Sequence, residues 1–234
     1  MTIPIKIIPK DEYLKTKSKP IQEKVWDKIS KPWKDYRIKT IPAVEKFLKN
    51  KKGKVIDLGC GTGRNMIPNN DIEYTGVDFS KGQLFHLKKN IKTDNLNAKI
   101  IKSEAYNLKQ IKTNTFDYGI FISALHCIET KEKREKSIEE LYRVLKPKGK
   151  ALITVWDSKD KRFSHIKNNG EVYMAWNDDH KPHMRYYYLF KKQELKDLIL
   201  SVGFKILSFL EYKESSKENI DRFNKKNWII EVQK

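Results

Sequence analysis

The sequence has little of several features that would define its class at once. It holds only two cysteines in 234 residues, too few for a disulfide framework or a four-ligand zinc site. No segment approaches the roughly 18 consecutive apolar residues that cross a membrane. Residues 1–15 show neither an apolar core nor a small-residue cleavage site, so we expect no secretory signal. These absences favour a protein of the reducing cytoplasm without a membrane anchor.

Acidic residues are also scarce relative to basic ones. Lys and Arg number 49 and Asp and Glu 30, which leaves a net charge of +19. Such an excess favours a polyanionic partner such as nucleic acid. The alternative is genome composition, because all but seven of the basic residues are Lys, and Ile and Asn are abundant too. Both interpretations stay open. Lysines are densest in residues 1–40 and 88–113, where an RNA footprint would lie.

From residue 53 onward, short apolar segments alternate with helical periodicity. An apolar content of 38% supports a core, and the length fits one α/β domain. The alternation predicts a parallel sheet with helices on both faces. The last two strands have no helix between them, so we expect them to pair antiparallel. The predicted strands are 54–58, 73–78, 98–102, 116–123, 150–156, 205–212 and 227–232, and the predicted helices are 80–90, 131–145 and 191–202.

Two segments lie outside this alternation. Residues 1–20 contain three prolines and predict an extended arm on the surface, and residues 21–50 show helical periodicity broken at Pro32 and Pro42. Residues 157–190 form a long insertion, and such insertions in compact domains are usually functional. We therefore expect an N-terminal part, 1–50, that packs on the core and covers the active site, and a main domain, 51–234, that carries the insertion.

The strongest local signal is a glycine-rich turn after the first of these strands, Asp57-Leu58-Gly59-Cys60-Gly61-Thr62-Gly63. Glycines allow positive φ and let the backbone approach a ligand closely. The G-x-G-x-G spacing is tighter than the G-x-G-x-x-G of dinucleotide-binding folds. We therefore expect a nucleoside with a small charged tail as the ligand, and a nicotinamide oxidoreductase ranks last. The next strand ends at Asp78, whose carboxylate can accept both hydroxyls of a ribose.

With D-L-G-C-G-T-G followed by V-D-F-S, residues 53–234 resemble the class I S-adenosylmethionine-dependent methyltransferases. The resemblance implies a Rossmann-like α/β fold, a seven-stranded and mostly parallel sheet with an antiparallel last strand and helices on both faces. It implies S-adenosylmethionine as cofactor, with Asp78 on the ribose, Phe79 on the adenine ring and Glu104 at the adenine amine. The cofactor-binding residues it implies are Asp57, Gly59, Cys60, Gly61, Gly63, Asp78, Phe79, Glu104, Ala105 and Ser123.

Flanking segments narrow the resemblance. R-Y-Y-Y-L-F at 185–190 and N-W-I-I-E-V-Q-K at 227–234 are similar to the tRNA wobble-uridine carboxymethyl methyltransferases, which esterify 5-carboxymethyluridine in the anticodon. Two positions depart from that family, whose second His after the fourth strand is Cys127 here and whose Tyr after the early Arg is Ile38. The resemblance implies two partners, a tRNA anticodon loop and a small zinc-binding activator subunit. The activator would cover the bare sheet edge at the third strand, 98–102.

The chemistry can be argued from the reacting groups. A carboxylic acid with a pKa near 4 is ionised at neutral pH, so its attack on a sulfonium methyl needs no general base. The site has to position its substrates, exclude water from them and hold the carboxylate. We expect Arg37 as a bidentate clamp, His126 at the mouth of the site, and Trp156 as a platform for a splayed base. Arg185, Tyr186 and Asn227 are expected to bind substrate.

Three other interpretations were weighed. His180 and His183 lie beside Asp178 and Asp179, but Pro182 separates the histidines and no cysteine assists, so we expect no metal site. The first rival function is a methyltransferase of a small-molecule carboxylate or a quinone precursor, which the glycine turn fits equally well. The second is a non-catalytic basic RNA-binding module, against which the intact glycine turn and Asp78 argue.

Overall fold

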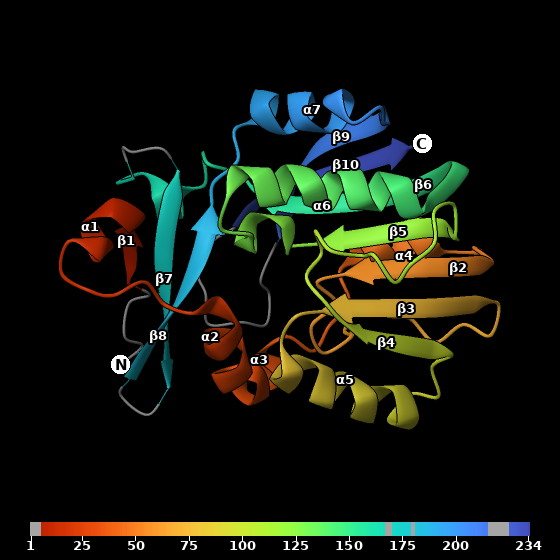
Figure 1. The fold of residues 1–234 in the computed structure, drawn as a ribbon, viewed down its shortest axis with the longest axis horizontal. Helices are drawn as coiled ribbons and strands as arrows, with labels where there is room; N and C mark the ends of the chain where they lie inside the picture. Colours follow the sequence, from red (N-terminus) through yellow and green to blue (C-terminus); the bar gives the residue numbers. More distant parts are fainter. Residues whose placement is uncertain (1–5, 167–169, 179–180, 215–224) are drawn as a thin grey trace.

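The computed structural model of the chain contains two sheets that lie side by side (Figure 1). It describes residues 6–166, 170–178, 181–214 and 225–234. The larger sheet has seven strands in the order β4-β3-β2-β5-β6-β10-β9, and the smaller has three in the order β1-β7-β8. The parallel strands of the larger sheet point toward the smaller sheet (Figure 1). None of the helices in these ranges is long and apolar enough to span a bilayer.

The larger sheet confirms the expected Rossmann-like topology. β2 pairs in parallel with β3 and β5, and β5 pairs in parallel with β6. β10 runs antiparallel to both β6 and β9, as expected for the last strand. All the predicted strands exist; 98–102 has the predicted bounds, and the others have shifted ends. The strands are β2 (Gly53–Leu58), β3 (Ile72–Asp78), β4 (Ala98–Lys102), β5 (Phe116–Ile122), β6 (Leu145–Trp156), β9 (Lys205–Glu214) and β10 (Lys225–Gln233).

Helices cover both faces of this sheet because successive strand residues point to opposite sides. Val55 packs on the side of α4 (Pro42–Leu48) and α5 (Lys81–Thr93). Its neighbour Ile56 packs on the side of α6 (Lys131–Val144) and α7 (Lys192–Ser201). The side chains of Val55 and Ile56, and the apolar helix side chains that pack against them, are nearly inaccessible to solvent. The central strands β2 and β5 are therefore buried on both faces, which is why they are rich in apolar residues.

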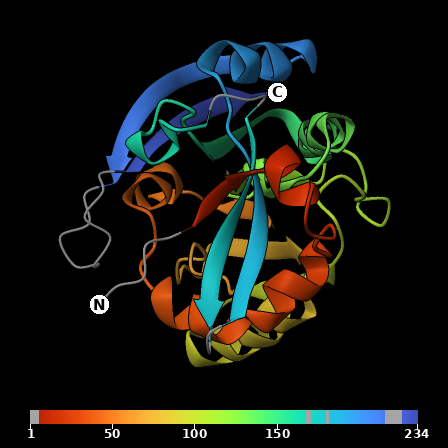
Figure 2. The ribbon, with the colours of Figure 1, turned by 90° about the vertical axis from the view of Figure 1, so that its left-hand side faces the viewer.

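The smaller sheet was not predicted. β7 (Glu171–Asp178) and β8 (Lys181–Tyr188) form a hairpin within the insertion, and β1 (Ile7–Pro9) adds antiparallel to β7. Figure 2 shows this hairpin crossing in front of the larger sheet. The expectation of an extended arm over residues 1–20 was wrong in part, because α1 (Lys10–Leu14) follows β1 directly. Its two acidic residues lie in the first turn, where the helix dipole favours negative charge.

Two short helices lie between the smaller sheet and α5 and pack against them. They are α2 (Gln22–Lys28) and α3 (Ser30–Tyr36). The predicted break at Pro32 was misplaced, since the chain turns at Ile29 and Pro32 lies in the first turn of α3, where its missing N–H is not needed. Pro42 likewise begins α4. Helix periodicity located these helices, but proline marked their starts and not their ends.

Candidate active site

A cavity of about 480 Å³ opens at the carboxyl ends of β2, β3 and β5. Ligands of mostly parallel sheets bind at this edge, where the strand order reverses. The volume falls within the roughly 300–1,000 Å³ typical of small-molecule sites. Most of the residues predicted to bind the cofactor line it: Gly59, Cys60, Gly61, Asp78, Phe79, Glu104, Ala105 and Ser123. Asp57 and Gly63 are not part of that lining.

The glycine turn after β2 has the backbone geometry that the sequence predicts. Gly59 has φ 64° and Gly61 has φ 54°, in the left-handed region. A Cβ built on Gly59 would lie 2.3 Å from the Cβ of Ala124, which follows β5. A side chain here would force β2 and β5 apart. The turn therefore presents bare backbone to the cavity because no larger residue fits between these two strand ends.

Two buried carboxyl groups stand at the ends of β2 and β3. Asp78 accepts the backbone N–H of Gly61 and of Ser80, each at 2.9 Å, so it fixes the glycine turn to the start of α5. Burial raises the pKa of Asp78 to about 6. Burial also raises the pKa of Asp57, with the charge of Asp78 adding to the effect. Asp57 Oδ2 has no hydrogen-bond partner among the described residues, although buried polar groups in proteins generally have one.

Gln83, in the first turn of α5, is a residue that the sequence reasoning missed. Its side-chain amide lines the cavity, and neither its nitrogen nor its oxygen finds a partner within the described ranges. A signal was present, since Gln83 is a polar residue buried on the sheet-facing side of a helix. Glu104 lies on the opposite wall, where burial raises its pKa and Lys133 opposes the shift.

A second, narrow cavity adjoins the first. It encloses about 40 Å³, room for a few atoms only, and the residues Trp26, Trp33, Arg64 and Ser123 line both cavities. We call it the slot. The structure brings four predicted substrate or catalytic residues together in its lining, namely Arg37, His126, Trp156 and Asn227. Tyr187 and Thr154 complete the wall on that side.

His126 is fully buried in the slot. Its Nδ1 accepts the backbone N–H of Trp156 at 3.4 Å, an arrangement that assigns the ring proton to Nε2. Nε2 has no partner in the part of the chain that the structure describes. Burial lowers the pKa of His126 to about 3, so the ring is neutral at physiological pH. His126 therefore offers one N–H donor to the slot and no acid–base chemistry near neutrality.

Ser123, directly after β5, is one of the four residues that line both cavities. It has φ 54°, an uncommon value for a residue with a side chain, and such strain concentrates at functional sites. Its N–H donates both to the carbonyl and to the hydroxyl of Thr154, at 3.0 and 2.9 Å. These two bonds hold the turn in place at the point where the cavities meet.

The indole of Trp156 does not have the free face that a base platform needs. Its ring stacks on Tyr187 at 4.2 Å and on His126 at 4.7 Å, measured between ring centroids. Phe163 stacks on it at 5.8 Å. Trp156 is consequently a rigid wall of the slot, contrary to the stacking role we expected. Trp33, in contrast, is only partly buried and lines both cavities.

Arg185 and Tyr186 lie outside the lining of both cavities. Tyr186 is on the far face of β8, where its hydroxyl donates to Glu171 at 2.6 Å. Strand alternation directs Arg185 and Tyr187 to the slot side instead. The slot is therefore lined by Tyr187 and not by Tyr186 as we expected. The run R-Y-Y-Y does not indicate which of its rings faces inward.

The guanidinium of Arg185 is buried in a cage of aromatic rings. It lies 5.2–5.9 Å from the ring centroids of Trp26, Trp33, Trp176 and Tyr187. It donates a hydrogen bond to the carbonyl oxygen of Ala175 at 3.4 Å, and burial lowers its pKa. Arg37 approaches the same cage, 5.4 Å from the ring centroid of Trp33. Two guanidinium groups thus bring positive charge to a dry region beside the slot.

The histidine pair considered as a metal site is only partly within the described residues. Asp179 and His180 lie outside them. Within the described ranges, the side chains form no group of three or more His, Cys, Asp or Glu that could hold a metal ion.

Comparison with known proteins identifies a methyltransferase domain over residues 55–149. The chain is 29% identical over 208 residues to a protein of Schizosaccharomyces pombe named tRNA (carboxymethyluridine(34)-5-O)-methyltransferase, a match that covers 78% of this chain and 88% of that protein. The Saccharomyces cerevisiae protein of the same name is 32% identical over 158 residues, 65% of this chain and 55% of its own length. A mouse protein named probable tRNA methyltransferase 9B is 31% identical, and the match spans only 33% of it.

Solved structures show the same fold. A SAM-dependent methyltransferase from Methanosarcina mazei aligns with a TM-score of 0.68 at 19% identity, over 84% of this chain and 98% of its own. The 1,6-didemethyltoxoflavin-N1-methyltransferase of Burkholderia thailandensis, solved with S-adenosylhomocysteine, aligns with a TM-score of 0.69 at 14% identity, over 99% and 96%. Residues 55–149 thus match a methyltransferase domain, the fold is the one seen in S-adenosylmethionine-dependent methyltransferases, and the chain is similar to the tRNA carboxymethyluridine methyltransferases.

Proposed function

We propose that the chain transfers a methyl group from S-adenosylmethionine to the carboxylate of 5-carboxymethyluridine at the wobble position of tRNA. The observation that carries the proposal is the slot, a small cavity with Arg37 in its wall, which shares lining residues with the larger cavity. The names of the yeast relatives support the same substrate. Cys60 and Cys127 are both free thiols, which suits the cytoplasmic location we propose.

The larger cavity fits the cofactor. The Gln83 amide lines it and is buried without partners among the described residues, and such a group calls for a polar ligand. We propose that Asp78 accepts the ribose hydroxyls, that Phe79 packs on the adenine and Glu104 meets its amine. The sulfonium would lie near Ser123, with bare backbone at Gly59 and Gly61 along the methionine part. When bound, S-adenosylmethionine supplies an electrophilic methyl group that an anionic oxygen can displace.

The substrate side needs an anion holder and no base. A carboxylate is ionised at neutral pH, and His126 with its lowered pKa is neutral there. We propose that Arg37 clamps the carboxylate, while the His126 Nε2–H donates a hydrogen bond to it. Arg185 adds positive charge from behind the aromatic wall without lining the slot. Water is kept out by the rings of Trp26, Trp33 and Trp156, and exclusion of water strengthens these charge interactions.

We further propose that Asn227 and Tyr187 define the inner end of the slot. Asn227 Oδ1 and the Tyr187 hydroxyl are buried and have no partner within the described residues. Both atoms can contact the uracil ring or its substituent. Tyr187 takes the place in the substrate site that we had expected for Tyr186.

The zinc-binding activator subunit remains part of the proposal. β4 is an edge strand of the larger sheet, paired only with β3 within the described chain. Ile100 and Ile101 on it are only partly buried. A partly apolar edge with open backbone groups is suited to pairing with another chain. A subunit that adds a strand there would cover it.

A methyl-transfer assay tests the proposal. The chain, alone and with a candidate activator, is incubated with labelled S-adenosylmethionine and tRNA that carries 5-carboxymethyluridine. We expect label on the wobble uridine that mild alkali releases, because an ester hydrolyses and an N- or C-methyl group does not. tRNA with plain uridine at that position is the control and should stay unlabelled. Alkali-stable label on a ring or a ribose would refute the carboxylate substrate. Labelling of a free small acid in preference to tRNA would favour the small-molecule rival.

A further inference from the structure

Helix α5 differs from the other long helices in its charges. Its sequence, K-G-Q-L-F-H-L-K-K-N-I-K-T, contains four lysines and no acidic residue. Helix α6, in contrast, alternates Lys and Glu and pairs them, as in Lys131 with Glu135 and Lys136 with Glu139. A bias of genome composition would raise Lys in both helices. The absence of acid from α5 alone therefore needs another explanation.

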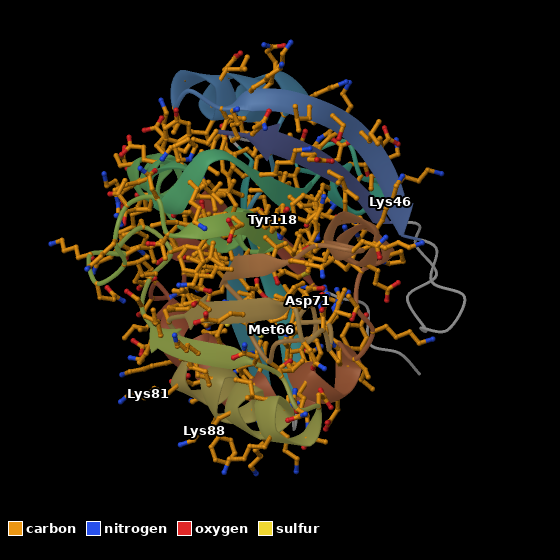
Figure 3. The ribbon with its side chains drawn as sticks, turned by 90° about the vertical axis from the view of Figure 1, so that its right-hand side faces the viewer. Lys46, Met66, Asp71, Lys81, Lys88 and Tyr118 are labelled. Carbon is orange, nitrogen blue, oxygen red and sulfur yellow. The ribbon has the colours of Figure 1, made fainter. Side chains whose placement is uncertain are left out.

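The lysines of α5 lie along one exposed stripe. Lys81, Lys88, Lys89 and Lys92 are exposed, at spacings that share a helix face. Lys81 and Lys88 project outward at the lower edge of the molecule in Figure 3. None of the four forms an ion pair with another residue in the described ranges, although lysines elsewhere do. The stripe is therefore an uncompensated row of positive charge.

Helix α3 extends this stripe toward the active site. It carries Lys31 and Lys34 and packs against the start of α5 so closely that a Cβ at Gly82 would lie 2.7 Å from the hydroxyl oxygen of Ser30. Asp27, near the end of α2, accepts from the hydroxyl of Ser80 at 2.6 Å and from the N–H of Gly82 at 2.9 Å. These bonds hold α2 on the start of α5, and the close contact at Ser30 places the start of α3 beside them.

Two further observations characterise this surface. The pKa of His86 on α5 is lowered, first by its partial burial and then by three neighbouring lysines, against one opposing carboxylate, Asp35. The positive potential is therefore strong enough to act on a neighbouring titratable group. Phe85, 56% exposed, lies in the middle of the stripe with the ammonium of Lys89 4.3 Å from its ring centroid. An exposed ring between cations is typical of surfaces that bind nucleic acid.

We infer that the surface formed by Lys31, Lys34, Lys81, Phe85, Lys88, Lys89 and Lys92, the α3–α5 surface, binds the phosphate backbone of the RNA whose carboxylate substituent enters the slot. Trp33 lies on α3 between Lys31 and Lys34 and lines both cavities, so one short helix connects the charged surface to the substrate site. Phosphates on this surface would orient the loop without reading its sequence. The inference depends on the proposed function in one respect, the identification of the bound RNA as tRNA.

The test compares two triple variants of the full chain with the same change in net charge. One is Lys88→Gln, Lys89→Gln and Lys92→Gln on the α3–α5 surface. The control is Lys191→Gln, Lys196→Gln and Lys205→Gln, all exposed positions on or beside α7, at the opposite edge of the molecule (Figure 1). Binding of a fluorescent tRNA transcript is measured without cofactor, by anisotropy, from low to moderate salt. A polyglutamate of similar length serves as a competitor.

We expect the first variant to bind tRNA about tenfold more weakly at moderate salt, and the slope of log affinity against log salt to flatten by about 2, since each lost phosphate contact removes roughly 0.7–0.9. The control should keep the slope of the original chain. Equal losses in both variants, or no loss in the first, would overturn the inference. If polyglutamate displaced tRNA as effectively as unlabelled RNA does, the result would point to an acidic protein as the partner of this surface. That result would also overturn the inference. Methyl transfer is measured separately, at saturating tRNA. If no methyl ester formed there, only the proposed function would be rejected, because tRNA binding is measured without cofactor.

Discussion

The two sides of the active site are built from different groups. The side that the larger sheet supplies consists of bare backbone and carboxylates, represented by Gly59, Gly61 and Asp78. The side that the smaller sheet and its helices supply consists of aromatic rings and guanidinium groups, represented by Trp33 and Arg37. The first suits a polar nucleoside with a cationic tail, and the second suits an anion held away from water. In the proposed function, the sheet side therefore holds the cofactor, and the side formed by the smaller sheet and its helices, the cap side, holds the substrate.

Removal of Asp78 should have the largest effect and should be confined to the cofactor. In Asp78→Ala the N–H groups of Gly61 and Ser80 lose their acceptor and the ribose hydroxyls lose theirs. We expect the affinity for S-adenosylmethionine, measured by calorimetry, to fall more than 100-fold, from several lost charge-assisted bonds of about 1.5–3 kcal/mol each. Asp71→Ala, which changes the exposed acid just before the other end of β3 (Figure 3), is the matched control and should bind normally. Similar affinities in the two variants would contradict the assignment.

Removal of Arg37 should have a somewhat smaller effect and should be confined to the substrate. Arg37→Ala should lower methyl transfer to tRNA about 100-fold, consistent with a charged hydrogen bond of about 1.5–3 kcal/mol, and leave the affinity for S-adenosylmethionine within about twofold. Arg37→Lys keeps the charge without the bidentate geometry and should recover part of the loss. Undiminished turnover in Arg37→Ala would remove the clamp. Loss of cofactor affinity in the same variant would erase the division between the two sides.

The pH dependence of cofactor binding sharpens the same comparison with a smaller effect. Burial raises the pKa of Asp78 to about 6, so the acceptor carboxylate is protonated at lower pH. Affinity for S-adenosylmethionine should fall by up to about tenfold per pH unit below that value, and Asp78→Asn should remove this part of the dependence. A flat profile for the original chain between pH 5 and pH 7 would show that Asp78 does not titrate there.

The same group has the opposite effect on the stability of the empty protein. Its folded-state pKa of about 6 exceeds the ordinary value of 3.8, so the folded chain binds a proton more tightly than the unfolded chain does. This contribution to the free energy of unfolding is therefore largest below pH 3.8 and is lost as the pH rises through about 6. Denaturant titrations of the original chain and of Asp78→Asn, without cofactor, isolate it.

The sheet side could be predicted from the sequence in more detail than the cap side. The glycine turn and Asp78 stand directly at strand ends, and parallel strands bring such ends to one edge, so local pattern implied the assembled site. The positions of Gly59 and Asp78 in the cavity lining followed from that rule. Gln83 was missed because an amide on a helix carries no comparable signal.

The cap side depends on contacts between distant segments. β1 pairs with β7 across more than 150 residues of chain, and no local pattern in residues 6–20 announces that pairing. The orientation of Tyr186 and Tyr187 depended on a strand register that three successive tyrosines leave undetermined. The role of Trp156 depended on which rings cover it, and Tyr187 and Phe163 come from segments that the sequence could not place beside it.

The most direct measurement of the central claim is calorimetric titration of S-adenosylmethionine into the full chain, with and without tRNA and a candidate activator. The cavity at the ends of β2, β3 and β5 predicts one molecule bound per chain, displaced by S-adenosylhomocysteine. Absence of binding at every concentration tested, in all of these mixtures, would contradict the account and leave a basic α/β scaffold without catalysis.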